Sequence, residues 1–255
     1  MKKKSSNAEN KLIWERNEPV ASPPPVPLTR ESIVRVAIEI ADKEGLSSVS
    51  FRKVAAFMGA GHMRLYTYFD TKEELLELML DTFFSEIVIN EIPSSDWKEG
   101  IRAISNNTRK AALKHPWIID ILGNRPHISP NALVYIEKRL AILYQGSESK
   151  EMGPIFLASM TLKAYIMGFI RDEISELRAE SESKLNNKSF YETTETYMKR
   201  MVDTGRFPMI GKVMSNASSS SLEKEFIEGL ECILDGIELR LLKSKKDKTK
   251  KSKTI

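Results

Sequence analysis

Cysteine is almost missing from this chain, since Cys232 is the only one among 255 residues. A single thiol excludes an intramolecular disulfide and suits a reducing cytoplasm. The three histidines are scattered and give no zinc-ligand spacing, so neither a metal site nor a cofactor is expected. The sequence also lacks a paired nucleophile and base and a phosphate-binding glycine loop. An enzymatic function therefore has no positive support.

Long apolar runs are also missing. No uninterrupted apolar stretch approaches the roughly 18 residues that span a bilayer. Lys2, Lys3 and Lys4 are followed by polar residues rather than by the apolar segment of a secretory signal. Hydrophobic residues make up an ordinary 41% of the chain, enough for one large or two small domains. We therefore expect a cytoplasmic protein without a membrane segment.

The net charge of +4 is unevenly distributed. Residues 243–255 carry a net charge of +6 and residues 1–18 carry +2, which leaves −4 for the segment between them. Within that acidic segment, residues 50–72 carry +3. An acidic body with one basic region is the asymmetry of a localised phosphate-contacting face. The lysine-rich end is either a solubilising tail or a source of salt-sensitive DNA affinity.

Helical periodicity dominates the chain, and we see neither an alternating strand pattern nor an internal repeat. The pattern predicts an all-α fold of about nine or ten helices in two domains. Prolines and polar residues mark residues 1–27 as a disordered extension. The predicted domains are a three-helix unit over 28–72 and a larger helical body over 73–242, followed by a disordered lysine-rich tail over 243–255.

The helix boundaries follow from caps and breakers. After a first helix that opens at Thr29, predicted helices cover 71–92, 95–115, 130–146, 150–177, 189–204 and 220–242. The polar residues 178–188 are predicted to form a loop.

Residues 50–72 contain two short helical patterns around a glycine turn. Phe51, Val54 and Met58 share one face of the first pattern, and Ser50 can cap its N-terminus. Gly59 and Gly61 interrupt the helix, and a second segment runs from 62 to 69. This arrangement predicts a helix-turn-helix, whose second helix enters the DNA major groove.

The same residues resemble a known family. The pattern Ser50-x-Arg52-Lys53-Val54-Ala55, Gly59, Leu65-Tyr66-x-Tyr68-Phe69 and Lys72-x-x-Leu75-Leu76 resembles the DNA-binding domain of the tetracycline-repressor (TetR) family over roughly residues 29–80. The resemblance implies a double-stranded DNA operator as partner. It also implies that Arg52, His62, Met63, Arg64, Tyr66 and Tyr68 occupy DNA-contacting positions. Ser50 and Lys72 are further candidates for DNA contact, because a hydroxyl or an ammonium group can bind a phosphate.

The residue types divide these positions between two tasks. Arg64 and Arg52 suit bidentate contacts to guanine, whereas Tyr66, Tyr68 and Lys72 suit phosphates. Two alternatives stay open: Tyr68 also suits packing against the first helix, and His62 also suits an exposed helix cap.

The body resembles the C-terminal domains of the tetracycline-repressor class, through motifs such as His115-Pro116-Trp117, Leu122-Gly123-Asn124-Arg125-Pro126 and Arg206-Phe207-Pro208. This resemblance implies a homodimer formed through helices near 150–177 and 220–242, with glycines that permit close helix approach. It also implies a small-molecule effector held in the body.

The effector pocket is predicted from Trp117, Asn124, Arg125, Tyr165 and Asp172. Trp117 also suits a core position, and Asp172 also suits a solvated or bundle face. Ile121 occupies the position of a metal-binding histidine in the tetracycline repressor class. Isoleucine cannot ligate a metal, which argues against a tetracycline–magnesium ligand.

The predicted function is a homodimeric transcriptional repressor that a small-molecule effector releases from a palindromic operator. One alternative is an activator, or a DNA-binding regulator without a ligand. A remote alternative is a helical enzyme or scaffold that has lost DNA binding.

Overall fold

The computed structural model describes residues 28–87, 96–122, 127–183, 188–216 and 221–251. These residues form helices without any strand, which confirms the all-α prediction. The N-terminal unit contains α1 (Arg30–Glu44), η2 (Leu46–Ser48), α2 (Phe51–Phe57) and η3 (His62–Thr67). The remaining helices are α3 (Lys72–Glu86), α4 (Trp97–Lys114), α5 (Ile118–Ile121), α6 (Pro130–Gly146), α7 (Met152–Ser183), α8 (Lys188–Asp203), α9 (Pro208–Asn216) and α10 (Leu222–Lys251).

Side-chain caps fix where the N-terminal helices begin. The Thr29 hydroxyl accepts a hydrogen bond from the Ser32 amide at 3.0 Å, and the Ser32 hydroxyl accepts one from the Thr29 amide. The Ser50 hydroxyl accepts one from the Lys53 amide. Gly45 and Gly59 lie at φ values of +81° and +64°, where glycine is free of steric strain. The predicted caps and turns therefore set the spacing of the small domain.

The second element of the helix-turn-helix is a 3₁₀ helix, η3, rather than the predicted α-helix. Backbone hydrogen bonds join Arg64 to Gly61 and Tyr68 to Leu65, both over three residues. Only Leu65 in this element is fully buried, so one side chain anchors it to the core. Its length of six residues exceeds the three or four that are common for a 3₁₀ helix.

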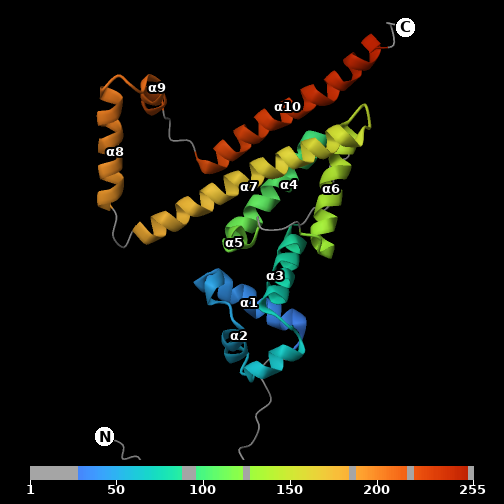
Figure 1. Ribbon diagram of the computed structural model, residues 1–255, viewed down its shortest axis with the longest axis vertical. Coiled ribbons are helices and arrows are strands. Elements are labelled where there is room, and N and C mark those ends of the chain that lie inside the picture. The colour runs from blue at the N-terminus through green and yellow to red at the C-terminus, as the bar shows by residue number, and fades with distance from the viewer. Residues whose placement is uncertain (1–27, 88–95, 123–126, 184–187, 217–220, 252–255) are drawn as a thin grey trace, which may run out of the picture.

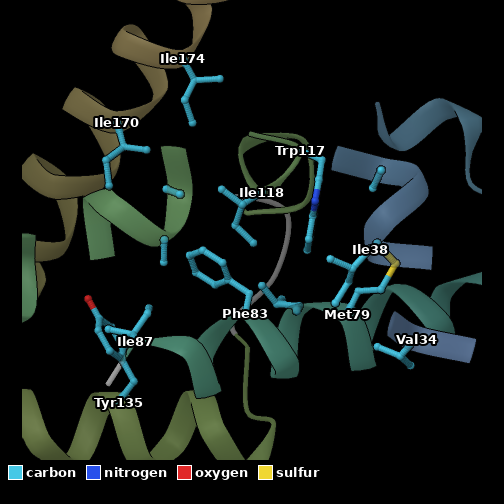
Figure 2. Packing of buried hydrophobic residues seen from close by; sticks show 14 of the residues in the cluster. Val34, Ile38, Met79, Phe83, Ile87, Trp117, Ile118, Tyr135, Ile170 and Ile174 are labelled. Atoms are coloured by element: carbon cyan, nitrogen blue, oxygen red, sulfur yellow. The ribbon is translucent and has the colours of Figure 1, made fainter. Parts of the chain in front are cut away.

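Helix α3 joins the two domains. Thr71 caps it, and Glu74 reaches back to the Asp70 amide. Figure 2 shows Met79 of α3 beside Val34 and Ile38 of α1, while Phe83 lies toward Ile118 of the body. One continuous hydrophobic core therefore extends from the small domain into the body.

In the body, α4, α6 and α7 pack against one another, and α10 lies along α7 (Figure 1). The Tyr165 hydroxyl donates to the Phe226 carbonyl at 2.7 Å. A Cβ at position 229 would lie 2.3 Å from the Tyr165 hydroxyl, so any other residue there would have to displace the Tyr165 side chain from its hydrogen bond. This close approach fixes α7 against α10 within one subunit.

Helix α7 has many apolar side chains on its outer surface, including Phe156, Leu157 and Met160. The stretch Met152–Ser181 is long and apolar enough to cross a membrane by length and composition. This criterion allows up to two charged side chains in an 18-residue window, whereas the sequence contains no uninterrupted apolar run of that length. Ile155, Leu162 and Ile166 of the same helix are buried against the body, which identifies α7 as a core helix with an additional apolar face.

Several helix boundaries differ from the predictions. α3 ends at Glu86, before the predicted 92, and residues 88–95 lie outside the described part of the chain. α7 continues through the predicted loop to Ser183, because Arg178 is held by Asp120 and the Pro116 carbonyl. α9 was not predicted, and Pro208 occupies its first helical position, where proline is well tolerated. α10 continues to Lys251, past the predicted end at 242.

Candidate nucleic-acid interface

The outer surface of α2 and η3 presents an exposed row of side chains. Met63 is 67% exposed and Tyr66 is 49% exposed, while Arg52, His62 and Arg64 are also exposed. Leu65 and Phe69 point the other way and are buried in the core. The predicted DNA-contacting residues named here are therefore exposed, while Leu65 and Phe69 anchor this part of the chain in the core.

The cations near this face differ in their electrostatic partners. Lys53 is paired with Glu44 of α1. Neither Arg52 nor Arg64 forms an ion pair with any residue that the structure describes. Their guanidinium groups are therefore available for bidentate contacts with guanine or phosphate.

The remaining predicted contacts are distributed around this face. Tyr66 packs edge-on against Phe51, with ring centroids 5.0 Å apart, which orients its ring on the exposed side of η3. Ser50 is exposed as well as capping α2, and Lys72 is half-buried at the start of α3.

Tyr68 has a structural role at the edge of the face. Its hydroxyl donates to the Leu28 carbonyl at 2.9 Å, and its own carbonyl accepts a hydrogen bond from Arg30. The structure therefore favours packing against the first helix, the alternative left open for Tyr68. Arg30 was not predicted, because it lies 38 residues away in sequence and carries no motif of its own.

A polar cluster joins the small domain to the body. The Asp42 carboxylate on α1 accepts hydrogen bonds from the Trp117 indole, at 2.7 Å, and from His115. The other ring nitrogen of His115 lies 3.0 Å from Glu86 at the end of α3, and Lys114 donates to the same carboxylate. Burial raises the pKa of Glu86, but the hydrogen bonds from Lys114 and His115 outweigh it and leave that pKa below its ordinary value.

The predicted effector-pocket residues occupy separate environments. Trp117 is 1% exposed in the junction with α1, so its surroundings match the core alternative. Tyr165 stacks on Phe226 between α7 and α10, and Asp172 is exposed on the outside of α7. Asn124 and Arg125 lie outside the described residues.

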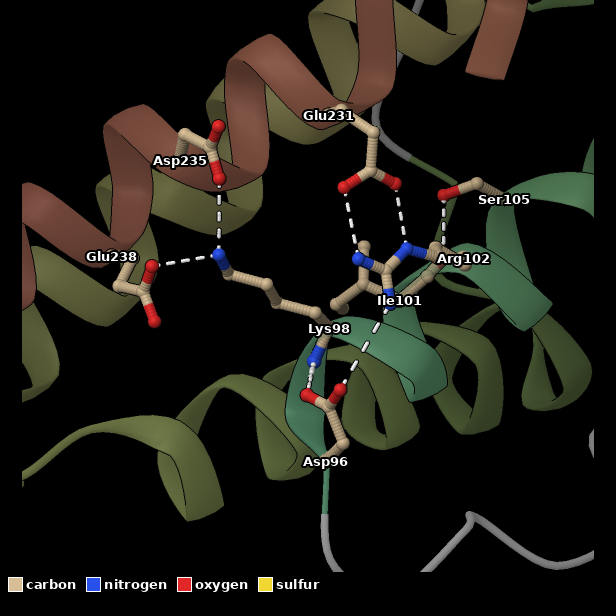
Figure 3. Close-up of polar contacts among 8 residues, drawn as sticks. All are labelled: Asp96, Lys98, Ile101, Arg102, Ser105, Glu231, Asp235 and Glu238. Carbon is tan, nitrogen blue, oxygen red and sulfur yellow. Dashed lines mark hydrogen bonds and ion pairs between the residues drawn. The ribbon is translucent and has the colours of Figure 1, made fainter. Parts of the chain in front are cut away.

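Ion pairs connect α4 to α10, as Figure 3 shows. Lys98 donates to Asp235 and Glu238, and Arg102 forms a bidentate pair with Glu231 at 2.6 and 2.9 Å. The hydrogen bond from Arg102 lowers the pKa of Glu231. These contacts hold α10 beside the start of α4 as well as beside α7.

The lowered pKa of Glu231 predicts a pH-dependent contribution to stability. A depressed carboxyl pKa adds stability above the ordinary value of 4.5 and loses it as pH falls through the folded-state value. We expect Glu231→Gln to lower the free energy of unfolding by about 0.5–1 kcal/mol at neutral pH, because the pair is partly exposed. Urea titrations of both proteins at neutral and acidic pH measure this difference. If the difference in the free energy of unfolding between the wild type and Glu231→Gln grows as pH falls below 4.5, the prediction is contradicted.

Comparison with known proteins places both domains. Residues 33–79 match the family model described as "Bacterial regulatory proteins, tetR family", and residues 91–241 match "Tetracyclin repressor-like, C-terminal domain". The chain belongs to the TetR family.

Individual TetR relatives agree with this assignment. The HTH-type transcriptional repressor DrrR1 of Streptomyces coeruleorubidus is 29% identical over 89% of this chain and 84% of its own. An HTH-type transcriptional regulator of Saccharopolyspora erythraea is 30% identical over 68% of this chain and 72% of its own. The crystal structure of Streptomyces coelicolor ActR in complex with actinorhodin superposes with a TM-score of 0.70 and 25% identity, covering 85% of this chain and 99% of that one.

The TetR assignment confirms two of the predictions. The chain is a DNA-binding transcription regulator and not an enzyme. TetR regulators bind DNA operators, act as dimers and bind small-molecule effectors.

Proposed function

We propose that this TetR protein is a homodimeric repressor that binds a palindromic operator and leaves it when an effector binds the helical body. The observation that carries the proposal is the exposed pair Arg52 and Arg64, which has no ion-pair partner among the described residues. Both arginines lie on elements packed against the core that α3 shares with the body. A change in the body that moves α3 therefore moves the reading surface.

The dimer is proposed to form through the outer faces of α7 and α10. Leu157 and Met160 are 49% and 46% exposed on α7, and Leu239 is 55% exposed on α10. A Cβ added to Gly168 or Gly236 would meet no atom within 4 Å, so both glycines face open space in the single subunit. Small residues on an apolar helix face permit a second pair of helices to approach closely.

The substitution Gly168→Leu tests this interface. Leucine favours a helix interior over glycine by roughly 0.8 kcal/mol, so the subunit itself should retain or gain stability. At a close-packed dimer interface, however, the added side chain is expected to convert the dimer to a monomer. Sedimentation velocity measures the oligomeric state, with circular dichroism as the control for folding. A dimer of unchanged affinity would place the interface elsewhere.

Footprinting on the DNA upstream of the protein's own gene, at two salt concentrations, tests operator binding. We expect a protected, roughly palindromic site, with half-sites arranged as the two reading surfaces of a dimer require. Protection that is diffuse and disappears at the higher salt concentration would indicate sequence-independent phosphate binding instead. An effector is then found as a compound that abolishes the specific footprint.

A further inference from the structure

The body contains one buried arginine with unusual partners. Arg139 on α6 is 4% exposed, and its Nε donates to the Ser159 hydroxyl of α7 at 3.0 Å. Its guanidinium lies over the Tyr135 ring, 5.2 Å from the ring centroid. The cation is therefore held between two helices by a neutral hydroxyl and an aromatic face.

Arg139 has no carboxylate partner among the residues that the structure describes. Arg109, in the same helical body, shows the usual arrangement, because it forms a bidentate pair with the buried Glu173. A buried cation is costly unless an opposite charge compensates it. The terminal nitrogens of Arg139 make no hydrogen bond with the described residues and are not among the enclosed polar atoms, so they remain open to an anion from outside the chain.

The surroundings connect Arg139 to three other helices. The Tyr135 hydroxyl lies 3.1 Å from the Thr108 hydroxyl of α4. The Tyr135 ring lies 5.4 Å, between centroids, from Phe84 of α3. A ligand bound to Arg139 would therefore be in contact, directly or through Tyr135, with α4, α6 and α7. Through the Tyr135–Phe84 contact it would also reach α3, which carries the DNA-binding domain.

We propose that Arg139 binds the anionic group of the effector, and that the effector is an apolar molecule bearing a carboxylate. The planar guanidinium fork matches a carboxylate bidentately. The half-buried Phe84 ring, which packs on Tyr135, provides an apolar neighbour for the hydrocarbon part of such a ligand. The inference rests on the proposed effector-controlled repressor and specifies the chemistry of its ligand.

Matched acids and amides test the charge requirement on the full-length protein. The probes are benzoate with benzamide, 2-naphthoate with 2-naphthamide, and octanoate with octanamide, each titrated against the midpoint of thermal unfolding at constant ionic strength. We expect at least one acid to stabilise the wild type saturably. Its apparent affinity should exceed that of its amide by about tenfold to a hundredfold, the range of a charge-assisted hydrogen bond.

Three variants assign this preference to Arg139. Arg139→Gln should bind the acid and the amide equally, whereas Arg139→Lys should retain part of the preference because it keeps the charge without the fork. Arg171→Gln is the matched control, since Arg171 is exposed on α7 and its side chain hydrogen-bonds, among the described residues, to the Leu122 carbonyl alone. Its preference for the acid should be unchanged.

Three results would overturn the proposal. The first is that the wild type prefers the acid over the amide in none of the three pairs. The others are that Arg139→Gln keeps the preference for the acid, or that Arg171→Gln loses it. The acid that binds best is then added to the operator footprint. Binding without release of the DNA would contradict the effector-controlled function while leaving the anion site in place.

Discussion

The double substitution Arg52→Ala with Arg64→Ala is expected to abolish operator binding while the protein remains folded and dimeric. Each bidentate contact to a base contributes about 1–3 kcal/mol, so losing both should weaken specific binding by roughly a hundredfold or more. Both side chains are exposed and unpaired among the described residues, so their removal leaves the core contacts intact. Fluorescence anisotropy with the footprinted operator measures the affinity, and sedimentation measures the dimer.

Lys53→Ala is the matched control for this experiment. Lys53 lies beside Arg52 on α2, but Glu44 already neutralises its charge. Its replacement should therefore change operator affinity far less than replacement of either arginine. Operator binding that persists in the double variant, or that is lost equally in Lys53→Ala, would remove α2 and η3 as the sequence-reading surface.

The substitution Glu173→Gln is expected to have the largest effect on stability. Glu173 is 4% exposed and pairs with Arg109, which also lies over the Phe226 ring of α10. Removing the carboxylate charge leaves a buried cation uncompensated, which costs about 3–5 kcal/mol. For a protein of this size, each kcal/mol lowers the melting temperature by roughly 2–4 °C, so the total decrease is about 6–20 °C. Differential scanning calorimetry measures it.

Two further variants of this chain test whether the uncompensated buried charge causes that loss of stability. Glu231→Gln removes a carboxylate from a similar bidentate pair near the surface, with both side chains 36% exposed, and should cost far less. Adding Arg109→Met to Glu173→Gln removes the uncompensated cation and should restore part of the stability. Equal losses in Glu173→Gln and Glu231→Gln would show that burial of the pair is unimportant.

The helix starts could be predicted from the sequence, because a helix start depends on side chains within a few residues of it. Thr29, Ser50 and Thr71 cap helices as expected, and Pro130 opens α6 as expected. Each depends on hydrogen bonds or steric limits within a few residues. The 3₁₀ geometry of η3 was not predicted, because a segment of six residues is too short for its side-chain periodicity to distinguish a 3₁₀ helix from an α-helix.

The contacts that organise the body could not be read from local patterns. Arg109 meets Glu173 across 64 positions and Arg139 meets Ser159 across 20. In both pairs the two residues lie on different helices. The periodicity within one helix therefore says nothing about which of them meet. The fold places the predicted pocket residue Trp117 in the core, Tyr165 between α7 and α10, and Asp172 on the exposed side of α7.

Helix α3 is held by the small domain along its first half and by the body along its second half, so a tilt of α3 moves the two domains relative to each other. Its N-terminal half is embedded beside α1, and Asp81 accepts two hydrogen bonds from Asn131 at the start of α6. Its 15 residues extend about 22 Å, so a tilt of about 5° displaces the far end by about 2 Å. If both α3 helices of a symmetric dimer tilted in this way, the spacing of the two reading surfaces would change by about 4 Å. This change exceeds the ~3.4 Å rise of one base pair. A rotation this small would put one reading surface out of register with its half-site.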